Sequence, residues 1–318
     1  MDLYNLKKNK LSEVRRLSFD LEKDIQILVE QNVETLFDLE FVSTEFRVGA
    51  FRLDSLCFDN ETNSFVVIEY KKGSSYSVID QGYSYMSVLL NNKSDFILEY
   101  IEKTGKTLKK SEVDFSQSRI IFISQSFNSY QKNSVNFKDV PFELWEIKKY
   151  SNGTISLNQH LSSSKESIQS VEGSKNSIIK DVSKEVKSYD ESYHTSKLNK
   201  SVIKNWEKLK EKFNELEGVE IVVKKRYITL MIGTKTISYF NFQKSKIVIE
   251  FIRGQIHTDG SKSRKFFEID DPKGISIENK WTYKSGVEGG GYKILFGKDV
   301  DIEYIMFLIK QKYANVVN

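Results

Sequence analysis

The sequence contains little cysteine and little histidine, which restricts its chemistry. Its single cysteine, Cys57, excludes an internal disulfide framework and fits a reducing interior. The three histidines, His160, His194 and His257, are scattered and lack the spacing of zinc ligands. A Cys/His metal site is therefore not expected, and any metal would be a hard, oxygen-bound ion such as Mg²⁺ or Mn²⁺.

Long apolar runs are also missing. No stretch approaches the roughly 18 to 20 apolar residues that a transmembrane helix needs, and the first residues lack the apolar core of a signal peptide. We therefore expect a cytoplasmic protein without a membrane partner. Hydrophobic residues make up 39% of the 318 residues and aromatic residues 13%, which is enough for the cores of two modest domains.

Charge is unevenly distributed along the chain. Residues 1–150 carry 20 Lys and Arg against 23 Asp and Glu, a net charge of −3, whereas residues 151–318 carry 28 against 21, a net charge of +7. This mild basic bias is compatible with nucleic-acid binding, but a solvated Lys-rich surface explains it more simply.

Helical and strand-like patterns alternate over residues 1–150, which predicts an α/β sandwich with a mixed sheet. Apolar spacing of three and four predicts helical structure over residues 11–39 and a helix from Ser77 to Asn92, with Ser77 as its N-cap. A short helix is expected within 126–137, and residues 102–117 are expected to form a loop. The β-rich segments predict strands at 41–48, 51–59, 64–71, 95–101, 119–124 and 142–150.

Composition changes after residue 150. Residues 151–198 are rich in Ser and Lys and poor in aromatics, which predicts a linker. Residues 199–318 are expected to form a small α+β domain that begins and ends with a helix, with strands between them at 219–232, 235–243 and 246–254.

Five polar residues stand out between positions 49 and 90. Asp54 lies in one predicted strand, and Glu69 and Lys71 lie two apart in the next, so these two project from the same face. Gln81 and Tyr85 are four apart in the following helix and share one side of it. The strands around the charged residues are apolar, so a functional role is favoured over an ordinary cross-strand ion-pair set.

This arrangement suits phosphodiester hydrolysis, which needs an activated water and positive charge against the developing oxyanion. Asp54 and Glu69 would hold a metal ion, and the backbone carbonyl of Tyr70 would be a further ligand. Lys71 would orient or deprotonate the attacking water, or neutralise charge in the transition state.

Four more charged residues are candidates for supporting roles. Arg52 shares a strand face with Asp54, and it would contact phosphate or pair with a carboxylate. Glu22, Glu30 and Glu45 are candidates for an extra metal-binding carboxylate, although most helix glutamates belong only to a solvated surface.

The spacing Asp54, fourteen residues, then Glu69-x-Lys71 resembles the PD-(D/E)xK nuclease superfamily, with Leu53 in place of the superfamily's proline. Gln81-x-x-x-Tyr85 resembles the RecB-like branch, in which these two residues lie beside the active site and contact the nucleic acid strand. Residues 15–150 resemble a bacterial family that is similar to the C-terminal domain of the NucS mismatch endonucleases. Over residues 200–318 there is a weaker likeness to the uncharacterised C-terminal domain of that bacterial family.

The resemblance implies a restriction-endonuclease-like mixed sheet flanked by helices, and a Mg²⁺- or Mn²⁺-dependent nuclease acting on DNA rather than RNA, in repair or anti-phage defence. The C-terminal domain would recognise a substrate feature, a protein partner or a second copy of the chain. Two alternatives stay open: a non-catalytic nucleic-acid- or protein-binding module that retains the fold, and a subunit that cuts only within a larger complex.

Overall fold

The computed structural model describes residues 2–71, 78–137, 139–161, 164, 166–168, 177–187, 189–263, 265–282, 286–297 and 301–317. The expected N-cap Ser77 lies outside these residues. The chain divides into two compact units, Met1–Ser188 and Tyr189–Asn318, and each is described by itself.

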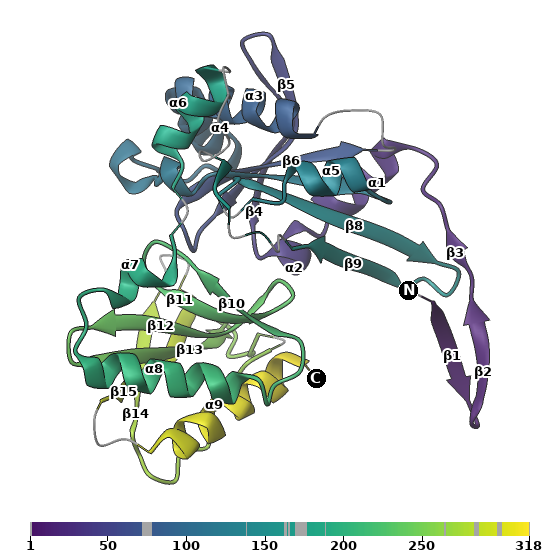
Figure 1. The fold of residues 1–318 in the computed structure, drawn as a ribbon. Coiled ribbons are helices and arrows are strands. Elements are labelled where there is room, and N and C mark those ends of the chain that lie inside the picture. The colour runs from purple at the N-terminus through teal and green to yellow at the C-terminus, as the bar shows by residue number, and fades with distance from the viewer. Residues whose placement is uncertain are drawn as a thin grey trace. The chain divides into compact units, whose positions relative to one another are not determined.

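A mixed seven-stranded sheet is the centre of the first unit (Figure 1). Its strands follow the order β3-β8-β7-β6-β5-β4, and β9 also pairs with β8. Strands β6, β7 and β8 run parallel to one another, and the other pairings are antiparallel. The bounds are β3 (Arg16–Leu17), β4 (Glu40–Val48), β5 (Phe51–Asp59), β6 (Ser64–Lys71), β7 (Arg119–Ser124), β8 (Phe142–Tyr150) and β9 (Ile155–His160). A separate hairpin precedes them, formed by β1 (Leu3–Lys7) and β2 (Lys10–Val14).

Helices cover both faces of this sheet. Alternation along β6 explains why, because Phe65 and Val67 join the core on one face while Val66 and Ile68 join the core on the other. The first core includes residues of α3 (Val78–Asn91) and α4 (Lys93–Thr104), and the second includes residues of α1 (Glu22–Glu30) and α2 (Val33–Phe37). The unit also contains α5 (Ser129–Ser134), α6 (Ser177–Glu185), and the short 3-10 helices η1 (Lys110–Glu112) and η2 (Phe115–Gln117).

Two of the expected elements are wrong. The helical structure expected over residues 11–39 begins only at Glu22, and the residues before it form β2 and β3. Residues 95–101 were expected to form a strand but belong to helix α4, whose buried residues Phe96, Ile97 and Tyr100 follow a helical spacing.

The linker expected over 151–198 is also corrected by the structure. Residues 155–160 form β9 at the side of β8, and α6 packs against α3. Ile168 and Val182 are buried in the first core. The first unit therefore extends past residue 150, and the division between the units falls at residues 188 and 189.

The second unit is an antiparallel sheet with helices on one face (Figure 1). Its strand order is β10-β11-β12-β13-β15-β14. Trp206 of α8 is fully buried against Phe240 and Phe242 of the sheet. The bounds are α7 (Glu191–Thr195), α8 (Lys200–Phe213), β10 (Val219–Val223), β11 (Ile228–Ile232), β12 (Lys235–Gln243), β13 (Lys246–Ile256), β14 (Ser276–Thr282), β15 (Glu288–Phe296) and α9 (Ile302–Val317).

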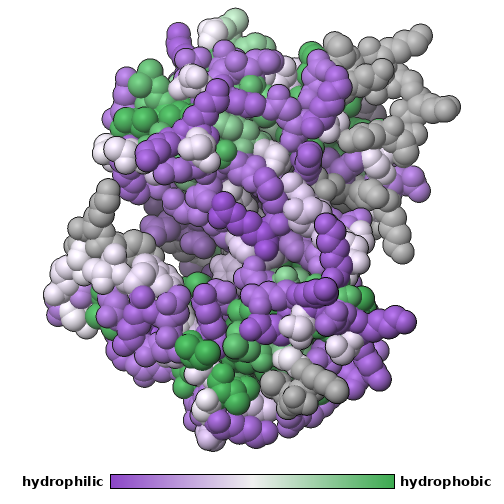
Figure 2. Space-filling view, turned by 90° about the vertical axis from the view of Figure 1, so that its left-hand side faces the viewer, coloured by the Kyte–Doolittle hydropathy of each residue, from purple (hydrophilic) through white to green (hydrophobic). Residues whose placement is uncertain are grey.

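Hydrophilic residues cover most of the surface seen in Figure 2, and the hydrophobic residues there form small, separate patches. Within the described ranges, no helix is both long enough and apolar enough to cross a membrane.

Candidate active site

Asp54 and Glu69 face each other where two strands of the first unit separate. The β5–β6 ladder pairs Leu56 with Val67 and ends at Ser55 and Ile68, so Asp54 and Glu69 are the next opposing positions. Beyond that end, the backbone N–H of Tyr70 donates to Asp54 Oδ2 at 3.1 Å.

Three side chains gather on one oxygen of Glu69. Its Oε1 lies 2.8 Å from Lys71 Nζ, 2.7 Å from Gln81 Nε2 and 3.3 Å from the Tyr85 hydroxyl. Gln81 Nε2 also donates to the Tyr85 hydroxyl at 2.9 Å, which fixes these two residues of α3 relative to each other. The structure thus brings together the five residues that the sequence placed on two successive strands and one helix face.

The second carboxylate oxygen of Glu69 is different. Oε2 is buried and has no hydrogen-bond partner among the described residues. Solvent does not replace that partner, because Glu69 as a whole is only 4% exposed. A buried carboxylate oxygen without a donor is costly. A ligand that supplies positive charge at this oxygen would relieve that cost.

Burial and mutual repulsion perturb both acids. Burial and, after it, the negative charge of Asp54 raise the pKa of Glu69 to about 7, against the lowering effects of Lys71 and Gln81. Burial also raises the pKa of Asp54, against the opposing effects of the Tyr70 amide and Lys71. The pair therefore tends to keep a proton that a dication would displace.

These donors fit a hard divalent ion. Two carboxylates are what the protein commonly supplies to Mg²⁺, with water and substrate completing the shell. Among the residues that the structure describes, no group of three or more His, Cys, Asp or Glu side chains is placed to hold a metal. Asp54 and Glu69, through its unpartnered Oε2, would be the protein's contribution to such a site, and the Tyr70 carbonyl stays a prediction as a further ligand.

Glu45 lies beside this pair but is held by cations. It stands in β4 opposite Asp54, between two paired positions, with a φ of 54°. Its carboxylate accepts from Arg52 Nε at 3.0 Å and Lys23 Nζ at 3.3 Å, and its charge adds to the rise in the pKa of Asp54. Of the two roles considered for Arg52, the structure gives it the carboxylate partner.

Glu30 and Glu22 do not join the acidic pair. Glu30 accepts from Ser55 Oγ at 2.6 Å, and the side chain of Ser55 points to the opposite face of β5 from that of Asp54. Glu22 is the first residue of α1 and is exposed. Neither is thus placed with the pair, and the role of an additional metal-binding carboxylate stays a prediction for both.

The sequence did not reveal Gln26, which contacts the backbone of Asp54 from helix α1. This residue of α1 is 4% exposed, and its Nε2 lies 3.0 Å from the Asp54 carbonyl oxygen and 3.1 Å from Thr44 Oγ1. It thereby fixes the backbone of β5 at the residue that carries the acid. Its place next to Ile25, on the buried side of α1, was the available signal.

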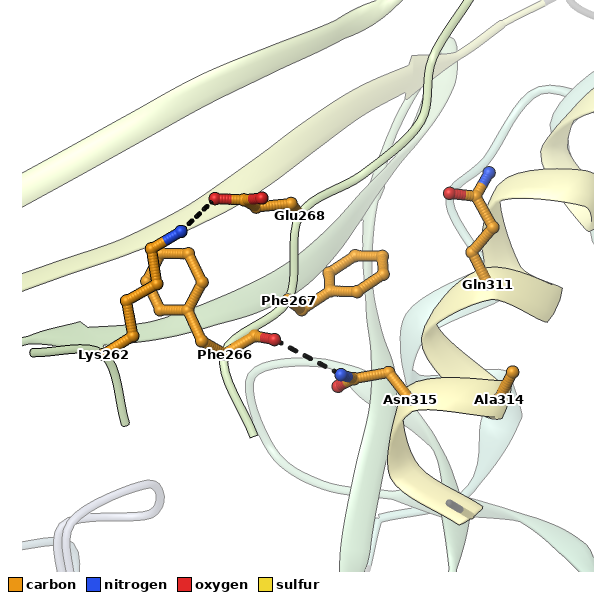
Figure 3. Close-up of a pocket in the computed structure, with 7 residues that line it drawn as sticks. All are labelled: Lys262, Phe266, Phe267, Glu268, Gln311, Ala314 and Asn315. Carbon is orange, nitrogen blue, oxygen red and sulfur yellow. Dashed lines mark hydrogen bonds and ion pairs between the residues drawn. The ribbon is translucent and has the colours of Figure 1, made fainter. Parts of the chain in front are cut away.

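A second concavity lies in the second unit, between the segment after β13 and the end of α9 (Figure 3). It measures about 550 Å³, but its polar groups are already engaged. Lys262 pairs with Glu268 at 2.5 Å, and both ends of the Gln311 amide bond the backbone of Asp270. Its lining consists of Lys262, Phe266, Phe267, Glu268, Gln311, Ala314 and Asn315.

Comparison with known proteins gives remote structural likenesses. No family model matches the chain. A complex of EndoMS with double-stranded DNA is 16% identical over 46% of this chain and 64% of its own, with a TM-score of 0.28. A repair endonuclease from Pyrococcus abyssi is 15% identical over 42% and 50%, with a TM-score of 0.25. SfsA from Pyrococcus furiosus with Ca²⁺ is 15% identical over 44% and 62%, with a TM-score of 0.23. The chain therefore spans less than two thirds of each of these proteins.

One relative matches from end to end. An uncharacterised protein of Haemophilus influenzae is 37% identical over 313 residues, which cover 98% of this chain and 99% of that protein. The match includes both units, and the chain belongs to the family of this Haemophilus influenzae protein.

Proposed function

We propose that the first unit is a metal-dependent nuclease that hydrolyses phosphodiester bonds, with DNA as the substrate. The observation that supports this best is the buried acidic pair. Asp54 and Glu69 face each other at a strand end, their pKa values are raised, and one oxygen lacks a donor. Such a pair costs stability in an empty site, and a divalent cation offsets that cost.

Each residue then has a role. Asp54 and Glu69 hold the ion, which when bound supplies positive charge against the developing phosphorane and lowers the pKa of water. Lys71 lies beside Glu69 and orients the attacking water or neutralises charge on the phosphate. Gln81 and Tyr85 position the nucleic acid strand. Their hydrogen bonds to Glu69 Oε1 also hold the side chain of Glu69 in place.

The second unit recognises a structural feature of the substrate, a protein partner or a second copy of the chain, and the whole protein acts in repair or defence against foreign DNA. These assignments rest on the sequence resemblance.

Cleavage assays test the proposal directly. Single-stranded, duplex and branched DNA, with RNA alongside, would be incubated with the full chain and Mg²⁺ or Mn²⁺. We expect cleavage by the wild type, loss of cleavage in Lys71→Ala, and retention in Lys103→Ala, which removes an exposed lysine at the end of α4.

Metal binding gives an independent readout. Titration calorimetry with Mn²⁺ should show binding to the wild type and its loss in Asp54→Asn. If the wild type binds no Mn²⁺ and cuts none of the substrates, the nuclease is refuted in favour of a binding module. If a co-purifying partner restores cutting, the chain is the catalytic subunit of a complex.

A further inference from the structure

The N-terminal hairpin is a separate arm of the first unit. Among the described strands, β1 and β2 pair with each other and with no other strand, and Figure 1 shows them extending from the end of the seven-stranded sheet. Tyr4 is 51% exposed, and the opposing pair Leu6 and Leu11 is 67% exposed at both residues. The arm is therefore a ribbon that carries Tyr4, Leu6 and Leu11 on one face, with Glu13 opposite Tyr4, and the described residues of the first unit leave this apolar stripe uncovered.

This ribbon is poorly stabilised by itself. An isolated two-stranded hairpin is at best marginally stable in water. Its turn places Lys8 and Asn9 at φ values of 48° and 61°, a geometry that favours Asn-Gly and that a lysine adopts at a cost of about 1 kcal/mol. Lys7 stands directly opposite Lys10, and like charges at opposing positions are destabilising. An anion bound between Lys7 and Lys10 would attract both side chains and offset their mutual repulsion.

Charge identifies the kind of partner. Residues 2–16 carry five Lys and Arg against two Asp and Glu, a net charge of +3, whereas residues 17–188, the rest of the first unit, carry 20 against 25, a net charge of −5. None of Lys7, Lys8 and Lys10 has an ion-pair partner in the described ranges. A polyanion is repelled by the body of this unit and attracted by the arm. An arm from a second copy would meet this one with like charge.

We infer that the arm binds duplex DNA, with its lysine tip on the phosphate backbone and the opposite face of the ribbon, which carries Leu6 and Leu11, against a groove wall. A two-stranded ribbon fits the major groove, which is about 12 Å wide. This inference rests on the proposed nuclease and adds the element that holds its substrate. The two remain separable, because the arm acts in binding and the acidic pair acts in cleavage.

The test measures affinity for a labelled DNA duplex against salt concentration, in the full chain carrying Lys71→Ala so that the duplex stays intact. The triple variant Lys7→Ala, Lys8→Ala, Lys10→Ala should bind more weakly. Its slope of log affinity against log salt should fall by about 2 to 3, since each lost phosphate contact removes about 0.9. The corresponding triple arginine variant keeps the charge and should bind like the parent.

A matched control removes three exposed lysines of the same unit, Lys103, Lys109 and Lys110, by substitution with alanine. The net charge changes equally, so a loss specific to the arm supports the inference. Equal losses in both triple variants would overturn it, because only net charge would then matter. Unchanged binding with a shift from dimer to monomer in light scattering would also overturn it, in favour of a second copy as the partner.

Cleavage by the wild type is scored separately. If the wild type cuts DNA but the triple alanine variant keeps the salt slope of the parent, the inference about the arm is refuted and the proposed nuclease stands. Duplex binding that depends on the arm, without cutting under any metal, refutes the nuclease alone. Absence of any duplex binding refutes the arm, and the cleavage assay still decides on the nuclease.

Discussion

Replacing Glu69 with glutamine should make the metal-free protein more stable at high pH. The folded protein holds a proton on Glu69 up to about pH 7, whereas the unfolded chain releases it near the ordinary value of 4.5. Between these values the folded state binds more protons than the unfolded state. The free energy of unfolding therefore falls as pH rises through this window.

The size of the effect follows from the shift. A rise from 4.5 to about 7, at 1.36 kcal/mol per unit, amounts to a loss of at most about 3 kcal/mol above pH 7. Glu69→Gln cannot lose a proton and keeps an oxygen for the neighbouring donors. It should match the wild type at about pH 4, below both pKa values, and it should exceed it by up to about 3 kcal/mol near pH 8.

Urea unfolding with a chelator at several pH values measures this difference. Glu34→Gln is the matched control, because Glu34 is exposed on α2, and it should show no pH-dependent gain. Added Mg²⁺ should then stabilise the wild type near pH 8 and leave Glu69→Gln unchanged, since binding to the folded state alone raises stability. A wild type whose stability is flat from about pH 5 to 8, or a variant that Mg²⁺ still stabilises, would refute the reasoning.

Three further substitutions test the surroundings of the pair. Tyr85→Phe removes a donor to Glu69 and should slow single-turnover cleavage about tenfold, the worth of one hydrogen bond to a charged group; an unchanged rate would contradict this. Gln26→Leu leaves buried acceptors without a donor and should lower stability to urea by about 2 kcal/mol, whereas a neutral effect would exclude Gln26 as a support. Gly82→Ala places a Cβ 2.7 Å from the Phe142 ring and should destabilise the protein by about 1 to 3 kcal/mol; an unaltered melting temperature would contradict the close packing.

The candidate site was accessible from the sequence because local periodicity determines it. Glu69 and Lys71 share a strand face at a spacing of two, and Gln81 and Tyr85 share a helix face at a spacing of four. The turn residues between two β-rich runs indicated the hairpin that carries Asp54. These rules relate residues that are only a few positions apart, so they can be recognised in a single sequence.

Other features depend on contacts distant in sequence. The contact of Gln26 with the backbone of Asp54 joins residues 28 positions apart, and the left-handed backbone of Glu45 leaves no mark in composition. The segment 95–101 is a short apolar run, and such runs do not distinguish a strand from a helix. Residues 155–160 carry only two apolar side chains, Ile155 and Leu157, among polar ones, and they become β9 because the edge of β8 is available to them.

The end of the β5–β6 ladder has a consequence for how this family can vary. Residues 60–63 join the two strands, and a longer turn there leaves the pairing of Ser55 with Ile68 intact. One residue inserted inside β6 before Ile68 would instead reverse every later side chain and turn Glu69 under α1, away from Asp54. Relatives can therefore differ in the number of residues between the two acids without losing the pair, provided that the length changes fall in this turn.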